Sequence, residues 1–349
     1  MNAEQRKWTV LISDFNYADN EIEREALAKW GADVIAAQCA TPQEVMEESR
    51  NVDAIISQYA PITAEVIASL TRCQVLARYG IGVDTIDVPA ATKREIAVIN
   101  VPSYCENEVS DHALGLLMAW ARRIPHYTDE IRNGVWDWKT GRPIHRLHGQ
   151  VLGLLGFGKI ARVLARKATA LGMEVIAHDP YVPDASFEEE GVPSVGWNEV
   201  LSRSDYLSIH VPLTSETRHL INADPLSQMK PTACLINTSR GGIVDEAALV
   251  RALQDDALAG ACLDVLEDEA PAADSPLLQL PQVLLTPHVA WYSEESQVEL
   301  RQTVSDDVGR ALNGVLPRGL FNKELEKLFT KSSDPTNGER SFDEPKAAK

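Results

Sequence analysis

Short apolar segments alternate with stretches of helical periodicity along most of the chain. In its first part the apolar segments have the length of buried strands, and they cover residues 8–13, 33–37, 53–57, 75–78 and 97–100. Helical spacing lies between them, for example in residues 20–30, where the pattern stops at Gly31. Strands that alternate with helices in this way predict a parallel sheet with crossover helices.

A second alternation follows a long helical stretch at residues 107–133, whose apolar run 112–120 predicts that much of it is buried. The later strand candidates are residues 151–155, 174–178, 206–211, 233–237, 259–264 and 283–286. An amphipathic helix is expected at 294–313, and the polar, low-complexity residues 331–349 are expected to form a disordered tail. The pattern as a whole predicts an α/β fold with two doubly wound parallel-sheet domains.

Composition agrees with two domains, since 349 residues are more than one hydrophobic core usually holds. The net charge of −18 disfavours nucleic acid and anionic membranes as partners. The chain shows neither a signal peptide nor a transmembrane run, and its five cysteines are not clustered. These features predict a cytoplasmic protein with reduced thiols, without a metal site.

A glycine-rich loop gives the clearest chemical signal. Gly156, Gly158 and Ala161 form a Gly-x-Gly-x-x-Ala motif between a predicted strand and a predicted helix. The first glycine permits a tight turn, the second lets a pyrophosphate approach the backbone, and the helix N-terminus attracts the phosphates. Asp179 ends the next strand, where a carboxylate binds ribose hydroxyls and repels a 2′-phosphate. The loop therefore predicts NAD rather than NADP, although such glycines can also merely shape a turn.

Three further side chains follow predicted strands at the edge where ligands bind in α/β sheets. Arg240 could bind a substrate carboxylate and polarise the adjacent carbonyl group. His288 could exchange a proton with the carbonyl oxygen, and Glu269 could orient its imidazole and favour the protonated form. Each has a plainer interpretation, namely a surface ion pair, a loop histidine and a solvated acid. Spacing alone does not establish that the three converge.

A set of motifs in a fixed order resembles the D-isomer-specific 2-hydroxyacid dehydrogenase family. The motifs are Arg78-Tyr-Gly-Ile-Gly82-Val-Asp84, the glycine loop, His210-Val-Pro212-Leu, Asn237-Thr-Ser-Arg240-Gly-Gly, Leu263-Asp264-Val and Thr286-Pro-His288. The resemblance implies an NAD-dependent interconversion of D-2-hydroxy acids and 2-oxo acids, with Arg240, Glu269 and His288 as the catalytic set. The D stereochemistry follows from the resemblance alone.

The resemblance also implies which residues bind the ligands. The substrate would meet the backbone N–H groups of the Tyr79-Gly80-Ile81 turn, together with Arg240, His288 and Trp291. The cofactor set comprises Ile81, Gly156, Gly158, Lys159, Ile160, Asp179, Val211, Pro212, Thr217, Thr238, Ser239, Arg240, Asp264, His288 and Trp291. Ala270 stands where the family usually has proline, so Glu267 and Asp268 remain alternatives to Glu269.

The same resemblance implies the architecture. Residues 1–103 and 291–330 would form a flavodoxin-like substrate-binding domain, residues 104–290 a Rossmann NAD-binding domain, and a cleft would lie between them. The stretch 107–133, with Trp120, Trp136 and Trp138 nearby, resembles the family's homodimer interface, although intramolecular packing could also explain it.

Two other functions remain open. The segment from His288 to Glu294 resembles the C-terminal-binding-protein branch, in which a tryptophan such as Trp291 favours a bulky apolar or thioether substrate side chain. That branch also allows an NAD(H)-sensing dimer that binds partner peptides, and Trp291 could be a plain core aromatic. A phosphorylated substrate such as 3-phosphoglycerate would need additional cations, for which Arg78, Arg122 and Arg142 are candidates.

Overall fold

A computed structural model describes residues 8–330 and divides into two compact units. Among the described residues, one unit combines 8–102 with 298–330, and the other is Ser103–Gln297. The second boundary lies inside helix α12 (Glu294–Leu312), seven residues beyond the predicted 291, because an uninterrupted helix leaves no break in the sequence pattern. The tail predicted at 331–349 lies outside the described residues.

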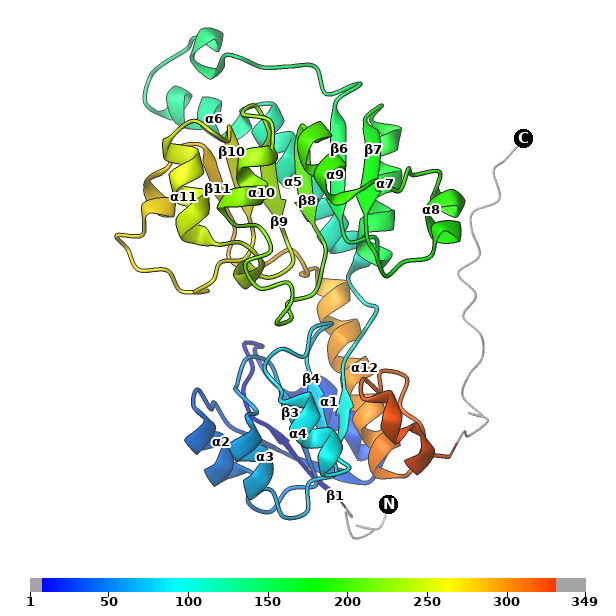
Figure 1. Ribbon diagram of the computed structural model, residues 1–349. Coiled ribbons are helices and arrows are strands. Elements are labelled where there is room, and N and C mark those ends of the chain that lie inside the picture. Colours follow the sequence, from blue (N-terminus) through cyan, green and yellow to red (C-terminus); the bar gives the residue numbers. More distant parts are fainter. Residues whose placement is uncertain (1–7, 331–349) are drawn as a thin grey trace, which may run out of the picture. The chain divides into compact units, whose positions relative to one another are not determined.

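The first unit is built on a five-stranded parallel sheet in the order β2-β1-β3-β4-β5, which is the flavodoxin-like order (Figure 1). Its strands are β1 (Trp8–Ile12), β2 (Ala32–Ala36), β3 (Ala54–Ser57), β4 (Val75–Arg78) and β5 (Ala97–Ile99). Its helices are α1 (Glu21–Ala28), α2 (Pro42–Glu48), α3 (Ala64–Ser69), α4 (Val88–Lys93), most of α12, and the 3-10 helix η4 (Lys323–Leu328). Local sequence sets the helix starts, since Thr41 and Glu44 form a reciprocal capping box at α2.

The second unit has a six-stranded parallel sheet in the order β11-β10-β9-β8-β6-β7. Its strands are β6 (Val151–Leu155), β7 (Glu174–His178), β8 (Tyr206–Ile209), β9 (Cys234–Asn237), β10 (Gly260–Leu263) and β11 (Val283–Leu285). Ser194 pairs with Ala177 of β7 in an isolated bridge, at the place of the third Rossmann strand. The chain then crosses to the other side of β6, so the strand order reverses between β6 and β8.

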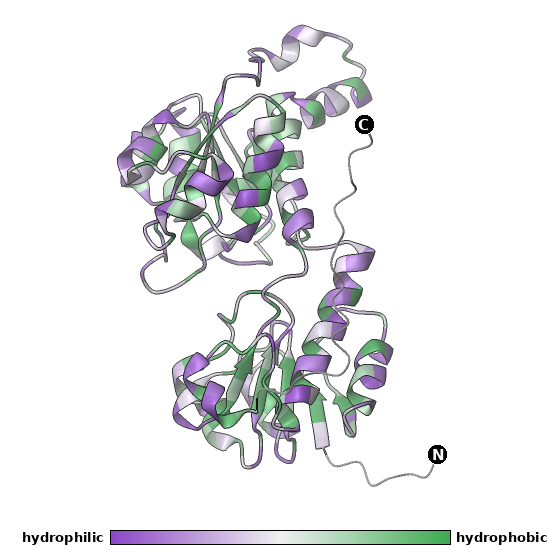
Figure 2. Ribbon diagram, turned by 90° about the vertical axis from the view of Figure 1, so that its right-hand side faces the viewer, coloured by the Kyte–Doolittle hydropathy of each residue, from purple (hydrophilic) through white to green (hydrophobic). Residues whose placement is uncertain are grey.

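Helices cover both faces of the second sheet. One face packs against α5 (Glu106–Ala121), α7 (Lys159–Ala170) and α8 (Asp184–Glu190). The other packs against α9 (Trp197–Arg203), α10 (Ala223–Gln228) and α11 (Glu246–Gln254). Figure 2 shows hydrophobic strands at the centre of each unit and helices with one polar side. The described part of the chain contains no helix that is long and apolar enough to cross a membrane.

The long helix expected at 107–133 is two helices. After α5 the chain turns at Arg123, whose φ of 54° is left-handed, and α6 (Ile124–Arg132) then begins with Pro125 in its first turn. Proline lacks the N–H that would continue the α5 hydrogen-bond ladder, so the break falls here. Short 3-10 helices complete this unit at η1 (Trp138–Gly141), η2 (Gly241–Ile243) and η3 (Pro276–Gln279).

Candidate active site

The glycine loop joins β6 to α7 at the point where the strand order reverses, which is where α/β sheets bind ligands. Gly156 has a φ of 89°, and a Cβ there would lie 2.9 Å from the carbonyl carbon of His210. Gly158 faces open space, and its residue type provides no side chain to cap the first turn of α7. The helix N-terminus and the absence of side chains at Gly156 and Gly158 fit a pyrophosphate.

Asp179 stands directly after β7 and braces this loop. Its Oδ2 accepts a hydrogen bond from the N–H of Phe157 at 2.8 Å, and its Oδ1 accepts one from the N–H of Tyr181 at 2.9 Å. Each carboxylate oxygen can accept a further bond. Asp179 can therefore support the loop and still bind a ribose hydroxyl.

The segment after β8 lies against the glycine loop, with the backbone of His210 beside Gly156. Thr217 donates its hydroxyl to the carbonyl of Pro212 at 2.6 Å, so the hydroxyl hydrogen is already used within the turn. Ser239 donates its hydroxyl to the carbonyl of Val211 at 2.5 Å, which ties the end of β8 to the end of β9. Thr238 Oγ1 is buried and has no hydrogen-bond partner among residues 8–330, so it could bind a polar group of a cofactor. Of the remaining loop residues, Lys159 is exposed and lies 3.9 Å from Glu106, and Ile160 is half-buried.

The loop that carries Arg240 is set by Asn237, the buried last residue of β9. The Asn237 amide donates to the carbonyl of Arg240 at 2.9 Å and accepts from the N–H of Ser239 at 3.0 Å. The next residue, Gly241, packs against the backbone of Leu266 and Glu267 so closely that any Cβ would clash. The arginine loop and the acidic loop are therefore in direct backbone contact.

Glu269 and His288 form the central pair of the site. His288 Nδ1 lies 2.7 Å from Glu269 Oε2, and because a carboxylate only accepts, Nδ1 carries the hydrogen. His288 follows β11 and has a φ of 52°, a left-handed conformation that is uncommon in non-glycine residues. The Trp291 indole N–H donates to the His288 carbonyl at 3.0 Å, which closes the turn.

The other two acidic candidates, Glu267 and Asp268, have hydrogen-bond partners other than His288. The N–H of Glu246 donates to Glu267 Oε1 at 3.1 Å, and Glu246 in turn accepts from the N–H of Glu267. Burial is the main cause that raises the pKa of Glu246. Asp268 accepts from the N–H of Ala270 at 3.1 Å, a bond that proline at this position could not make. Of the three acidic candidates, Glu269 is thus the one beside His288.

Asp264 is the buried residue after β10, between the strands that lead to Arg240 and His288. The family resemblance placed it in the cofactor set. In the structure its carboxylate accepts hydrogen bonds from Thr286 and from the N–H groups of Val289 and Ala290. His112, on α5, contacts the same Thr286. Sequence reasoning gave neither Thr286 nor His112 a role of its own, since the only signal was their place in family motifs.

The first unit contains the other predicted substrate residues. The N–H of Tyr79 already donates to the carbonyl of Ser57 at 2.9 Å, whereas those of Gly80 and Ile81 have no partner among the described residues. Gly80 has a φ of 137°, and a Cβ there would clash with the Arg78 guanidinium. Two N–H groups rather than three are thus available in this turn.

Comparison with known proteins defines the class first. Residues 114–290 match the family described as D-isomer specific 2-hydroxyacid dehydrogenase, NAD binding domain. The second unit is therefore an NAD-binding domain of the Rossmann type. The chain belongs to the D-isomer specific 2-hydroxyacid dehydrogenase family, whose members are NAD-dependent oxidoreductases acting on the CH–OH group of 2-hydroxy acids.

The chain is similar to a glyoxylate reductase from Korarchaeum cryptofilum, with 38% identity over 288 residues that cover 81% of this chain and 87% of that protein. It is 37% identical over 292 residues to a D-3-phosphoglycerate dehydrogenase from Methanocaldococcus jannaschii, covering 83% of this chain but 55% of that longer protein. A crystal structure of a glyoxylate reductase from Paecilomyes thermophila matches with a TM-score of 0.82 and 30% identity, over 92% of this chain and 100% of that one. The chain thus spans about half the length of the phosphoglycerate dehydrogenases it matches.

Proposed function

We propose that this protein interconverts 2-oxo acids and D-2-hydroxy acids with NAD, using Arg240, Glu269 and His288. The observation that carries the proposal is the 2.7 Å contact between Glu269 and His288, next to strands that end in the Arg240 loop and in Asp264. An imidazole fixed by a carboxylate, on the same sheet edge as the Arg240 loop and the glycine loop, fits this reaction better than simple binding.

The roles follow from the donors present. NAD supplies the hydride chemistry when it is bound. The Arg240 guanidinium would bind the substrate carboxylate and polarise its carbonyl group. During reduction His288 would give the proton on Nε2 to the carbonyl oxygen, and it would take that proton back during oxidation. Glu269 holds Nδ1, so that Nε2 is the atom directed to the substrate.

A kinetic experiment tests these roles. NADH consumption is followed by absorbance with a panel of 2-oxo acids, in the wild type and in His288→Ala, Arg240→Ala and Glu269→Ala. His288→Ala should lower kcat by roughly 10²- to 10⁴-fold, while NADH binding survives. Arg240→Ala should impair both KM for the 2-oxo acid and kcat. Asp268→Ala is the matched control for Glu269→Ala, and equal losses in these two variants, or full activity of His288→Ala, would refute the assignment.

We further propose that the first unit supplies the substrate-binding role and that Trp291 favours a bulky apolar 2-oxo acid. The hydrogen bond from the Trp291 indole to the His288 carbonyl supports the role of Trp291, because this bond fixes the indole beside the proposed proton donor. Faster turnover of glyoxylate than of long-chain 2-oxo acids would contradict it. The phosphorylated-substrate alternative has less support, since Arg142 stacks over Trp138 and Arg78 donates to the Gln58 carbonyl.

A homodimer is the proposed assembly. Trp136 and Trp138 are 87% and 66% exposed in the single chain, next to the exposed Ile124 and Ile131 of α6. Exposed apolar side chains gathered in one segment often mark a protein–protein interface. Sedimentation of wild type and of the Trp136→Ala/Trp138→Ala double variant tests this. The NAD(H)-sensing alternative is supported if NADH binds without turnover of any 2-oxo acid. The cytoplasmic location stays a prediction from composition.

A further inference from the structure

The loop that carries His288 is held from behind by a chain of hydrogen bonds. His112 Nε2 lies 2.9 Å from Thr286 Oγ1, and Thr286 Oγ1 lies 2.5 Å from Asp264 Oδ1. His112 Nε2 also lies 3.5 Å from Asp264 Oδ1, a longer direct contact. Asp264 Oδ1 accepts from the N–H of Val289 at 3.0 Å, and Oδ2 accepts from the N–H of Ala290 at 2.9 Å. This series of hydrogen bonds therefore joins helix α5, through the Thr286 side chain, to the backbone N–H groups of the two residues after His288.

The proton positions in this chain follow from the chemistry of its members. The Asp264 carboxylate accepts the N–H groups of the loop, and the Thr286 hydroxyl gives its single hydrogen to it. Toward His112 the Thr286 oxygen can then only accept. His112 must therefore carry a hydrogen on Nε2 and donate it.

The backbone at His288, which these hydrogen bonds support, is strained. His288 has a φ of 52°, and its own N–H donates to the Asp264 carbonyl at 2.8 Å. A left-handed conformation of this kind persists in a non-glycine residue when the surroundings over-determine it. Asp264, buried after β10, supplies that support at three consecutive N–H groups. Any contact of Asp264 with a cofactor would come in addition to this.

We propose that His112 is a positioning residue for the reaction proposed above, acting through Thr286 and Asp264 on the backbone of His288. This inference rests on the proposed function. His112 fixes the hydroxyl rotor of Thr286, so that its hydrogen points to Asp264 and the carboxylate stays oriented toward the loop. Losing the His112 donor frees the hydroxyl, and the imidazole of His288 then spends less time in its productive position.

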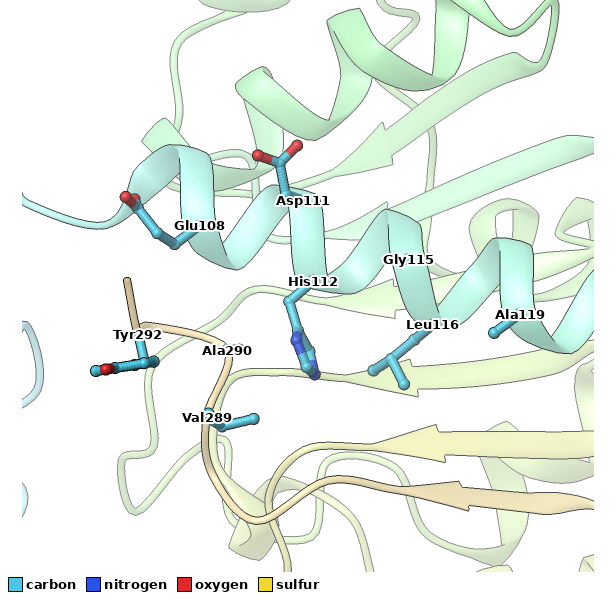
Figure 3. A pocket seen from close by; sticks show the side chains of 9 residues that line it. All are labelled: Glu108, Asp111, His112, Gly115, Leu116, Ala119, Val289, Ala290 and Tyr292. Carbon is cyan, nitrogen blue, oxygen red and sulfur yellow. The ribbon is translucent and has the colours of Figure 1, made fainter. Parts of the chain in front are cut away.

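Figure 3 shows how His112 and the other side chains of α5 lie relative to the His288 loop. His112 and Leu116 point from α5 toward the segment Val289-Ala290, whereas Asp111 points away from it. Asp111 forms an ion pair with Lys167 at 2.7 Å and is 65% exposed at its side chain. Asp111→Asn is therefore a matched control on the same turn of the helix.

The test compares four substitutions with this control. His112→Leu removes the donor, and His112→Gln offers an amide Nε2 that can replace it. Thr286→Val removes the hydroxyl at nearly constant shape, and Thr286→Ser retains it. His112→Leu and Thr286→Val should each lower kcat about 10- to 100-fold, as small misplacements of a catalytic group do. KM and NADH affinity should change less than kcat, and His112→Gln, Thr286→Ser and Asp111→Asn should stay close to wild type.

Two further measurements make the outcome decisive. The double variant His112→Leu/Thr286→Val should lose less than the product of the two single losses, because both side chains act on the same Asp264 carboxylate. Amide hydrogen exchange at Val289 and Ala290 should accelerate in His112→Leu and not in His112→Gln. This measurement can be made without substrate. If the wild type reduces none of the 2-oxo acids, the proposed function fails, while exchange still tests the positioning. The inference would be overturned if exchange and kcat were unchanged in His112→Leu, or if His112→Gln were equally impaired. It would also be overturned if the loss of kcat in the double variant equalled the product of the two single losses.

Discussion

Replacing Glu23 by glutamine should destabilise the first unit by about 3 kcal/mol. Glu23, on α1, is fully buried and receives two hydrogen bonds from Arg301 on α12, from Nε and Nη2, each at 2.7 Å. The Tyr79 hydroxyl donates to the same carboxylate at 2.9 Å. Glu23→Gln leaves the Arg301 charge buried without its main partner.

The magnitude follows from the burial of both partners. Removing one member of a buried ion pair costs about 3 to 5 kcal/mol, because the remaining charge stays desolvated. The Arg301 side chain is 5% exposed. It retains the carbonyl of Asp19 at 2.7 Å, and glutamine retains one accepting oxygen, so the lower end applies. With an m-value of about 1 to 3 kcal/mol/M, the urea midpoint of this unit should fall by about 1 to 3 M.

Urea unfolding followed by far-UV circular dichroism measures this. Saturating NADH should raise the transition of the second unit by mass action and so separate it from that of the first. The exposed pair Asp129–Arg132 in the second unit provides the control, and Asp129→Asn should leave both transitions unchanged. Glu23→Leu/Arg301→Met, which removes both charges, should recover most of the loss. A change below about 1 kcal/mol in Glu23→Gln would show that this pair is not a buried charge pair in solution.

Three other predictions address the cofactor crevice. Asp179→Ala should raise the kcat/KM for NADPH relative to that for NADH, and an unchanged ratio would mean that the carboxylate does not face the ribose. Gly156→Ala should weaken NADH binding in a fluorescence titration, because its Cβ would lie 2.9 Å from the His210 carbonyl and its φ is 89°; wild-type affinity would contradict the tight turn. Burial lowers the pKa of His210 to about 4, so from pH 6.5 down to pH 4 the unfolded chain binds a proton that the folded one does not. The free energy of unfolding should therefore decrease as the pH is lowered from 6.5 to 4. If proton uptake by His210 is the cause, His210→Gln should lose less stability over this range than the wild type.

The cofactor loop could be predicted from local sequence, because a glycine turn needs only its own strand and helix as context. Gly156 and Asp179 lie where that context puts them, at the ends of β6 and β7. The pairing of Glu269 with His288 could not be derived in this way. Nineteen residues separate the two, and only the register of β10 and β11 brings them together.

Other features lay beyond the sequence pattern for different physical reasons. The bridge at Ser194 has no hydrophobic run, so it gives no strand signal. The break between α5 and α6 combines the left-handed Arg123 with Pro125, and only the proline gives a sequence signal. The hydrogen bond between His112 and Thr286 joins positions 174 residues apart, and a histidine on a helix has no pattern that names its partner.

The close contact between the Arg240 loop and the acidic loop limits how this protein can be redesigned. Gly241 leaves no room for a side chain against Leu266 and Glu267, so the backbone conformation of each loop constrains that of the other. A laboratory that exchanges the acidic loop for one from a relative, to change substrate preference, would also move the guanidinium. The two loops should be transplanted as a pair, and libraries that vary one alone should yield mostly inactive proteins.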